Sequence, residues 1–300
     1  MARTHAETRP PWMEKPRRTT TGLKALLLVL VVVMVAYPLV YILAVSLSAS
    51  GAPVGDGLVL WPGRISFDAY RTVLNGGIVT RALLISIGVT VVGTLIAMVF
   101  TVAMAYGLTR TKDVPGSRFI LYLVLGTMLF GAGIIPNFLL VKSLGMVNTY
   151  WSLMIPGAIS AFNLVVVRNF FMEIPKELYD AARIDGAGEL QILWRVVLPL
   201  SKAVLAVISL FYAVALWSDF FNALLYLNDT SKWPIQLVMR QYVLEGTSLG
   251  GLSHNPNAPQ PPSHSVQMAV TVLATIPILI VYPFLQRYFT RGVLVGAVKG

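Results

Sequence analysis

The chain has 300 residues, of which 56% are hydrophobic and only 12% are charged, and its mean hydropathy is +0.73. A soluble domain carries about 25% charged residues, so this composition excludes a soluble globule and indicates a protein that lies mainly in lipid. The net charge of +10 does not require a nucleic-acid partner, because membrane proteins gain basic residues in their cytoplasmic loops. The absence of cysteine excludes thiolate catalysis, disulfide bonds and cysteine-ligated metals.

Six stretches with few charges are long enough to cross a membrane, which takes about 20 apolar residues in a helix. They are residues 25–49, 82–109, 119–141, 151–171, 200–227 and 266–286. They predict an all-α membrane protein with six transmembrane helices in one domain, residues 25–291. Two tails, residues 1–24 and 292–300, flank this domain.

The first stretch, residues 25–49, also shares features with a signal peptide, since basic residues come before it and small residues follow it at 48–52. Its apolar region of about 25 residues is longer than the roughly 7–15 residues of a signal-peptide core. A retained membrane helix is therefore the favoured interpretation.

The basic residues divide unequally between the two sides of the predicted bundle. If the segments between spans alternate sides, 17 of the 23 Lys and Arg fall on the side of the two tails and six fall on the other. The more basic side of a membrane protein is usually the cytoplasmic one. We therefore expect both termini in the cytoplasm.

Two predicted spans contain residues that are unusual inside a membrane. In the third span Gly131, Gly133 and Pro136 remove side-chain bulk and a backbone donor, which predicts a kink or a close helix contact. In the fifth span Asp219 is the one acidic residue. It follows Lys202 by 17 positions. Because a helix rises about 1.5 Å per residue, Asp219 is expected near the outer interface.

Polar and aromatic residues near the end of the fifth span are candidates for contacts with a transported solute. Trp217, Phe221 and Asn222 offer the aromatic faces and the amide that sugars bind. Asp219 would lie at the outer mouth of this path, and Asn163 adds an amide in the fourth span. The alternative is structural, with hydrogen bonds between helices for the asparagines and interface anchoring for the aromatic residues. Anchoring is the favoured interpretation for Trp217.

The sequence lacks the motifs of an enzyme. No glycine is followed by lysine, so the chain has no phosphate-binding P-loop and is not expected to be an ATPase. The three histidines lack the spacing of zinc ligands, and no metal site is expected. Residues 246–250 spell G-x-S-x-G, but a nucleophile elbow needs a strand before it and a helix after it. Here the pattern begins an outer segment rich in glycine and proline, so a serine hydrolase is not expected.

The predicted cytoplasmic loop at residues 173–198 differs from the rest of the chain because it holds five of the 13 acidic residues. Pro175 suits the start of a helix and Gly186 suits its end, so we expect a helix at about residues 177–185, then a turn and a second helix. The first helix combines small residues, which permit close approach, with acids that can pair with a basic partner. The residues of this predicted docking surface are Glu177, Asp180, Ala181, Ala182, Asp185, Gly186 and Ala187. From these residues alone, a solvated interfacial helix is an equal alternative.

Three parts of this loop resemble the EAA motif, by which permease subunits of ABC importers dock on their ATPase. They are Asp180, Ala181, Ala182; Asp185, Gly186, Ala187; and Leu198, Pro199. Asp180 stands where the family usually has glutamate, which keeps the charge but shortens the reach. Residues 292–300 resemble the tail of MalG-like carbohydrate permeases, and residues 136–242 resemble their LplC-style branch, which serves oligosaccharide uptake.

This resemblance implies a type I ABC importer permease fold, with a cytoplasmic coupling helix at the acidic loop. The implied protein is a non-catalytic transport subunit of the bacterial cell (inner) membrane that imports a carbohydrate, expected to be an oligosaccharide. Its implied partners are a second homologous permease, two ATPase subunits, an extracytoplasmic sugar-binding protein and membrane lipid. ATP and magnesium would bind to the ATPase, so no cofactor is expected in this chain.

Two other kinds of transporter remain as alternatives. An ABC importer permease for an amino acid, a peptide or phosphate would share the same docking loop. A secondary transporter would need coupling-ion groups near the middle of the bilayer, and Asp219 is expected too close to one end of its span for that role.

Overall fold

The computed structural model describes residues 18–49, 60–62, 64–75, 77–110, 115–244 and 264–297. The G-x-S-x-G pattern, most of the amino-terminal tail and the last three residues lie outside these ranges. The described residues form helices joined by short connections. The β-structure within these ranges is an isolated bridge between Ser48 and Ile65. The predicted all-α class is therefore confirmed for the described part of the chain.

The helices follow one another along the chain with short gaps between them. Their bounds are α1 (Arg18–Ser46), α2 (Asp68–Asn75), α3 (Ile78–Thr109), α4 (Ser117–Leu129), α5 (Ile134–Ser143), α6 (Trp151–Met154), α7 (Ala161–Met172), α8 (Lys176–Ile184), α9 (Glu189–Ile192), the π-helix η1 (Leu193–Val197), α10 (Leu198–Leu200), α11 (Lys202–Trp217), α12 (Phe220–Tyr226), the 3-10 helix η2 (Thr230–Lys232), α13 (Ile235–Leu244) and α14 (His264–Ala297).

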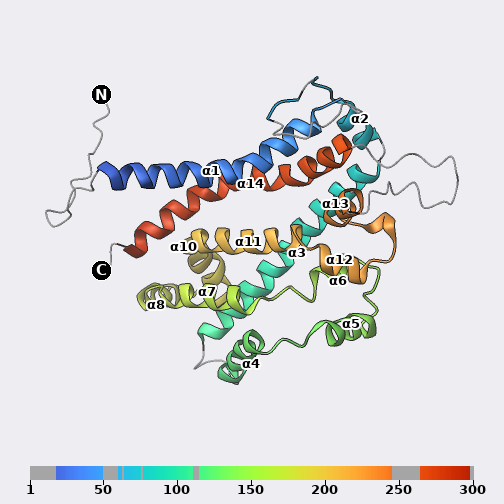
Figure 1. The fold of residues 1–300 in the computed structure, drawn as a ribbon. Helices are drawn as coiled ribbons and strands as arrows, with labels where there is room; N and C mark the ends of the chain where they lie inside the picture. Colours follow the sequence, from blue (N-terminus) through green and yellow to red (C-terminus); the bar gives the residue numbers. More distant parts are fainter. Residues whose placement is uncertain are drawn as a thin grey trace.

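Three of the described helices, α1, α3 and α14, are long and apolar enough to cross a membrane. A fourth crossing results if the bent pair of α9–α10 and α11, which meet at 86°, counts as one span. α1 and α14 lie side by side (Figure 1). The beginning of α1 and the end of α14 lie at the same end of the bundle as α8 (Figure 1). We call this the inner end, after the predicted orientation, and the opposite end the outer end.

The other predicted spans are built from shorter helices. The third is divided into α4 and α5 by an extended segment at 130–133, where Gly133 has a φ of 84°. The sequence predicted a kink here, and the structure has a complete break. The fourth is divided into α6 and α7, and the fifth into α11 and α12. Since these pieces are too short to cross a bilayer singly, the count of six spans stays a prediction.

α3 runs through the middle of the bundle and packs against α7 and α11 (Figure 1). A row of mostly small buried residues along α3, spaced three or four apart, permits this contact: Ala82, Ser86, Val89, Gly93, Ala97, Thr101 and Ala105. At Gly93 an added Cβ would lie 2.8 Å from Leu216 on α11, so only glycine fits there without a shift. Thr101 and Tyr212 join the two helices through their hydroxyls at 2.7 Å.

Candidate functional sites at the two ends of the bundle

The predicted docking helix is present as α8, within a residue of the expected bounds at either end. Pro175 precedes it, and Gly186 ends it with a φ of 79°, a conformation that favours glycine. The Gly186 N–H donates to the carbonyl of Arg183, and the Ala187 N–H donates to the carbonyl of Ala182. These two bonds turn the chain sharply from α8 toward α9.

One face of α8 packs on the bundle. Tyr179 is buried, and its hydroxyl donates to the carbonyl of Phe171 at the end of α7, at 3.2 Å. Burial raises the pKa of Tyr179, so the hydroxyl keeps its proton for this bond. Ala182 is half-buried on the same side, together with Ala187. Both were predicted as docking residues, and they also pack against the bundle.

The opposite face of α8 is exposed. This face and the turn that follows the helix carry most of the predicted docking residues: Glu177, Asp180 and Ala181 on α8, then Asp185 and Gly186. The exposed face also carries Ile184, whose side chain is 86% exposed, and Leu190 follows on α9 at 74%. Large apolar side chains on a predominantly acidic surface are typical of a protein interface. The motif contains no signal for these two residues, so sequence analysis missed them.

A second inner feature, which sequence analysis also missed, surrounds Glu189 at the start of α9. Its carboxylate binds Arg110 at the end of α3, with Nη2 3.1 Å from Oε2, and Arg183 on α8, with Nη2 2.9 Å from Oε1. The Tyr106 hydroxyl donates to Glu189 Oε2 at 2.5 Å. The Arg110 guanidinium lies 5.2 Å from the Tyr106 ring centre and 4.7 Å from that of Tyr179. We call these five residues the Glu189 cluster.

The charge state of Glu189 follows from these contacts. Partial burial raises the pKa of its carboxyl, but the hydrogen bonds from Tyr106 and Arg183 and the charges of Arg110 and Arg183 outweigh it. The pKa therefore lies below its ordinary value, and Glu189 is ionised at neutral pH.

The predicted path residues divide into two groups. Asp219 precedes α12, where its Oδ1 accepts the Asn222 N–H at 3.1 Å and its Oδ2 accepts the Asn222 side-chain amide at 2.8 Å. Phe221, next to them, is 45% exposed. Trp217 is buried instead, and its indole N–H donates to the carbonyl of Ala274 on α14. Asn163 is buried on α7. The structure thus brings Asp219, Phe221 and Asn222 together.

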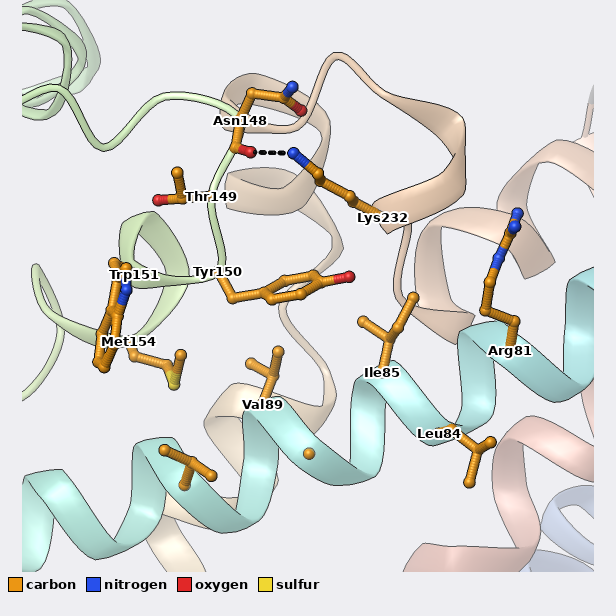
Figure 2. A pocket seen from close by; sticks show the side chains of 12 residues that line it. Arg81, Leu84, Ile85, Val89, Asn148, Thr149, Tyr150, Trp151, Met154 and Lys232 are labelled. Atoms are coloured by element: carbon orange, nitrogen blue, oxygen red, sulfur yellow. Dashed lines mark hydrogen bonds between the residues drawn. The ribbon is translucent and has the colours of Figure 1, made fainter.

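The outer end has a groove of about 680 Å³ between α3, the segment before α6 and η2. Figure 2 shows the Tyr150 ring over Ile85 and Val89 of α3. Lys232 closes one side, where its ammonium donates to the carbonyl of Asn148 at 2.8 Å. Arg81 on α3 also lines the groove, so two cations border an otherwise mainly apolar groove. Sequence analysis counted both cations only as signals of topology.

Known proteins resemble this chain over most of its length. The "Polygalacturonan/rhamnogalacturonan transport system permease protein YtcP" of Bacillus subtilis (strain 168) is 46% identical over 88% of this chain and 92% of its own. "Protein LplC" of the same organism is 44% identical over 88% and 89%. Among solved structures, a chain of a bacterial ABC transporter "involved in the import of the acidic polysaccharide alginate" superposes with a TM-score of 0.83. It is 32% identical, over 93% of this chain and all of that chain.

The fold and these likenesses lead to one assignment. The similarity to the alginate transporter chain confirms the predicted ABC importer permease fold. Residues 116–295, which include α8 and α9, match the family described as "Binding-protein-dependent transport system inner membrane component". The chain therefore belongs to this family of inner-membrane transport subunits.

Proposed function

We propose that this chain is a permease subunit of an ATP-driven ABC importer for an oligosaccharide, and that α8 docks on the ATPase. The observation that carries the proposal is the exposed surface formed by α8 and the start of α9, which presents acidic, small and two large apolar residues at the inner end of a transport-family fold. A solvated connector has no need of exposed Ile184 and Leu190.

The remaining parts of the importer are supplied by other chains. A second homologous permease would complete the translocation path, two ATPase subunits would bind ATP and magnesium, and an extracytoplasmic protein would deliver the sugar. Both termini would lie in the cytoplasm beside the ATPases. ATP-driven movement of the ATPases would displace α8 and shift the bundle between states open to either side.

The proposed cargo is an acidic oligosaccharide. The names of two similar proteins refer to polygalacturonan and to the acidic polysaccharide alginate. Arg81 and Lys232 at the outer groove are cations of the kind that bind uronate carboxylates. Phe221 is exposed beside Asn222, and an aromatic face next to an amide suits a sugar ring and its hydroxyls. Since phosphate is also an anion, an importer for a phosphorylated solute is the second candidate.

The experiment is purification of the tagged chain from native membranes, with mass identification of the chains that accompany it. Uptake into proteoliposomes then compares galacturonate oligosaccharides, neutral oligosaccharides of equal length, and sugar phosphates. We expect an ATPase, a second permease and preferential uptake of the galacturonates. Purification without an ATPase would contradict the docking proposal, and preferential uptake of the neutral sugars or sugar phosphates would contradict the proposed cargo.

A further inference from the structure

The Glu189 cluster connects the docking helix to the centre of the bundle. We propose that Glu189 is a positioning residue that makes α8 and the inner end of α3 move as one rigid body, so that a displacement of α8 moves the inner end of α3 by the same amount. This inference rests on the proposed function, because it assigns the route of the movement that an ATPase would impose on α8.

The contacts of the cluster favour rigidity. Glu189 is bound from both sides, by Arg110 from α3 and by Arg183 from α8. The Arg110 side chain is only 16% exposed, and its Nη2 also donates to the Tyr106 hydroxyl at 3.0 Å. An isolated exposed ion pair contributes little to stability. A network of charge-assisted hydrogen bonds around a mostly buried guanidinium holds the helices that it joins more firmly. Glu189 therefore joins α3 and α8 through two ion pairs, and the contact of the Arg110 guanidinium with the Tyr179 ring of α8 adds to this link.

Two further bonds extend the rigid unit to α7. The Tyr179 hydroxyl of α8 donates to the Phe171 carbonyl at the end of α7. The Arg168 Nε of α7 donates to the Leu108 carbonyl of α3 at 3.0 Å. α3, α7 and α8 are thus joined in a closed triangle, with Glu189 at the side between α8 and α3. Since α3 also packs along α11, movement of this triangle would reach the part of the bundle that carries the proposed path.

A purely structural role for the cluster predicts a different defect. If Glu189 only stabilised the fold, its loss would lower the amount of intact complex but not the efficiency of each complex. If it transmits movement, intact complexes would hydrolyse ATP with little uptake. The number of sugars imported per ATP hydrolysed separates the two roles.

The first experiment replaces Glu189 in the full importer complex. Glu189→Gln keeps the shape but removes the charge, so we expect assembly to persist while sugar uptake per ATP falls about tenfold, within the usual range of coupling between sites. Arg110→Lys should give a similar fall, because lysine keeps the charge but loses the forked geometry and the stacking on two rings. Glu173→Gln is the matched control, because it removes an exposed acid of the same loop that has no ion pair among the described residues.

The second experiment restores the link by covalent means. The chain has no cysteine, so Arg110→Cys with Glu189→Cys introduces a unique pair. We expect the reduced double variant to be uncoupled and a short bismaleimide cross-link to restore most of the uptake per ATP. Wild type treated with the same reagent controls for reaction with cysteines of the partner chains.

The outcomes separate this inference from the proposed function. Failure of the wild-type complex to contain an ATPase or to take up sugar would overturn the proposed function itself. If the wild type is coupled and Glu189→Gln remains equally coupled, the positioning role is wrong. A cross-link that blocks uptake would also overturn it, since it would show that α3 and α9 must separate during transport.

Discussion

At the residue scale, the backbone conformation of one glycine determines how α8, the proposed docking helix, ends. Gly186 has a φ of 79°, whereas Gly188, two positions later, has an ordinary φ of −70°. A side chain at a left-handed position costs about 1–2 kcal/mol, and a β-branched one is the least tolerated there. Position 186 therefore favours glycine, whereas the backbone at position 188 accepts other residues, although both glycines lie in the same turn of the sequence.

This difference gives a paired prediction. Gly186→Val should destabilise the turn by at least about 1 kcal/mol and weaken co-purification of the ATPase. Gly188→Ala should leave both thermal stability and co-purification near wild type, because an added Cβ meets no atom within 4 Å. Thermal unfolding of the detergent-solubilised complex, with quantification of the bound ATPase, checks both. Equal tolerance of the two changes would contradict the left-handed turn.

The lowered pKa of Glu189 predicts how pH acts on the inner end. A carboxyl whose pKa is lower in the folded state stabilises that state above its ordinary pKa of 4.5, and this contribution is lost as pH falls through the folded-state value. Wild type should therefore melt at a higher temperature than Glu189→Gln at pH 7. The difference should persist to about pH 5 and vanish in more acidic buffer. Melting curves of both proteins across this pH range test the direction of the effect. A difference in melting temperature that increases on acidification would contradict the lowered pKa of Glu189.

At the element scale, the sequence predicts features that depend on neighbouring residues, such as helix ends. It does not predict contacts between residues that are far apart in the chain. Pro175 and Gly186 predict the bounds of α8, because helix ends depend on neighbouring residues. The Glu189 cluster joins Tyr106 to a residue 83 positions away, and no local pattern indicates such a pairing. The role of Trp217 depends likewise on α14, whose Ala274 carbonyl receives the indole N–H.

The exposed face of α8 predicts which changes prevent docking. Asp180→Lys should reduce ATPase co-purification and uptake by placing a positive charge against a basic partner surface, while Asp180→Glu should preserve both. Ala181→Trp should obstruct docking sterically. It is a cleaner change than Ala182→Trp, because Ala182 is half-buried against the bundle and the larger side chain would also disturb packing there. If both Asp180→Lys and Ala181→Trp assemble and transport normally, α8 is a solvated connector.

The residues at the break between α11 and α12 that were predicted to line a solute path can be tested by substitution. Phe221→Ala should reduce uptake without changing assembly, because the exposed ring is available to a sugar. Asn222→Ala should do the same, with an added loss of stability, because its side-chain amide also binds Asp219. Trp217→Phe, which removes a bond to α14, serves as the comparison and should act on stability first. Uptake and sugar-stimulated ATPase activity that are unchanged in both alanine variants would show that these residues do not line the path.

At the scale of the whole molecule, the asymmetry of charge agrees with the arrangement of the helices. The beginning of α1, the end of α14 and α8 lie at one end of the bundle, and α2 and α13 lie toward the other (Figure 1). The basic residues on the predicted cytoplasmic side outnumber those on the opposite side by 17 to six. Hydropathy and charge predict this overall arrangement, because both follow from the bilayer itself. They do not predict that several spans are broken, since the breaks depend on packing against neighbouring helices.

The topology can be tested directly because the chain has no cysteine, so each introduced one is unique. Single variants Thr4→Cys, Asp229→Cys and Lys299→Cys in intact cells or spheroplasts, treated with a membrane-impermeant maleimide, should react only at position 229. Permeabilisation should then expose the other two. Asp229 lies next to η2 at the outer groove, so its labelling also tests whether this groove faces away from the ATPases. Labelling of position 299 before permeabilisation would place the carboxyl end outside and would overturn the six-span model with both termini in the cytoplasm.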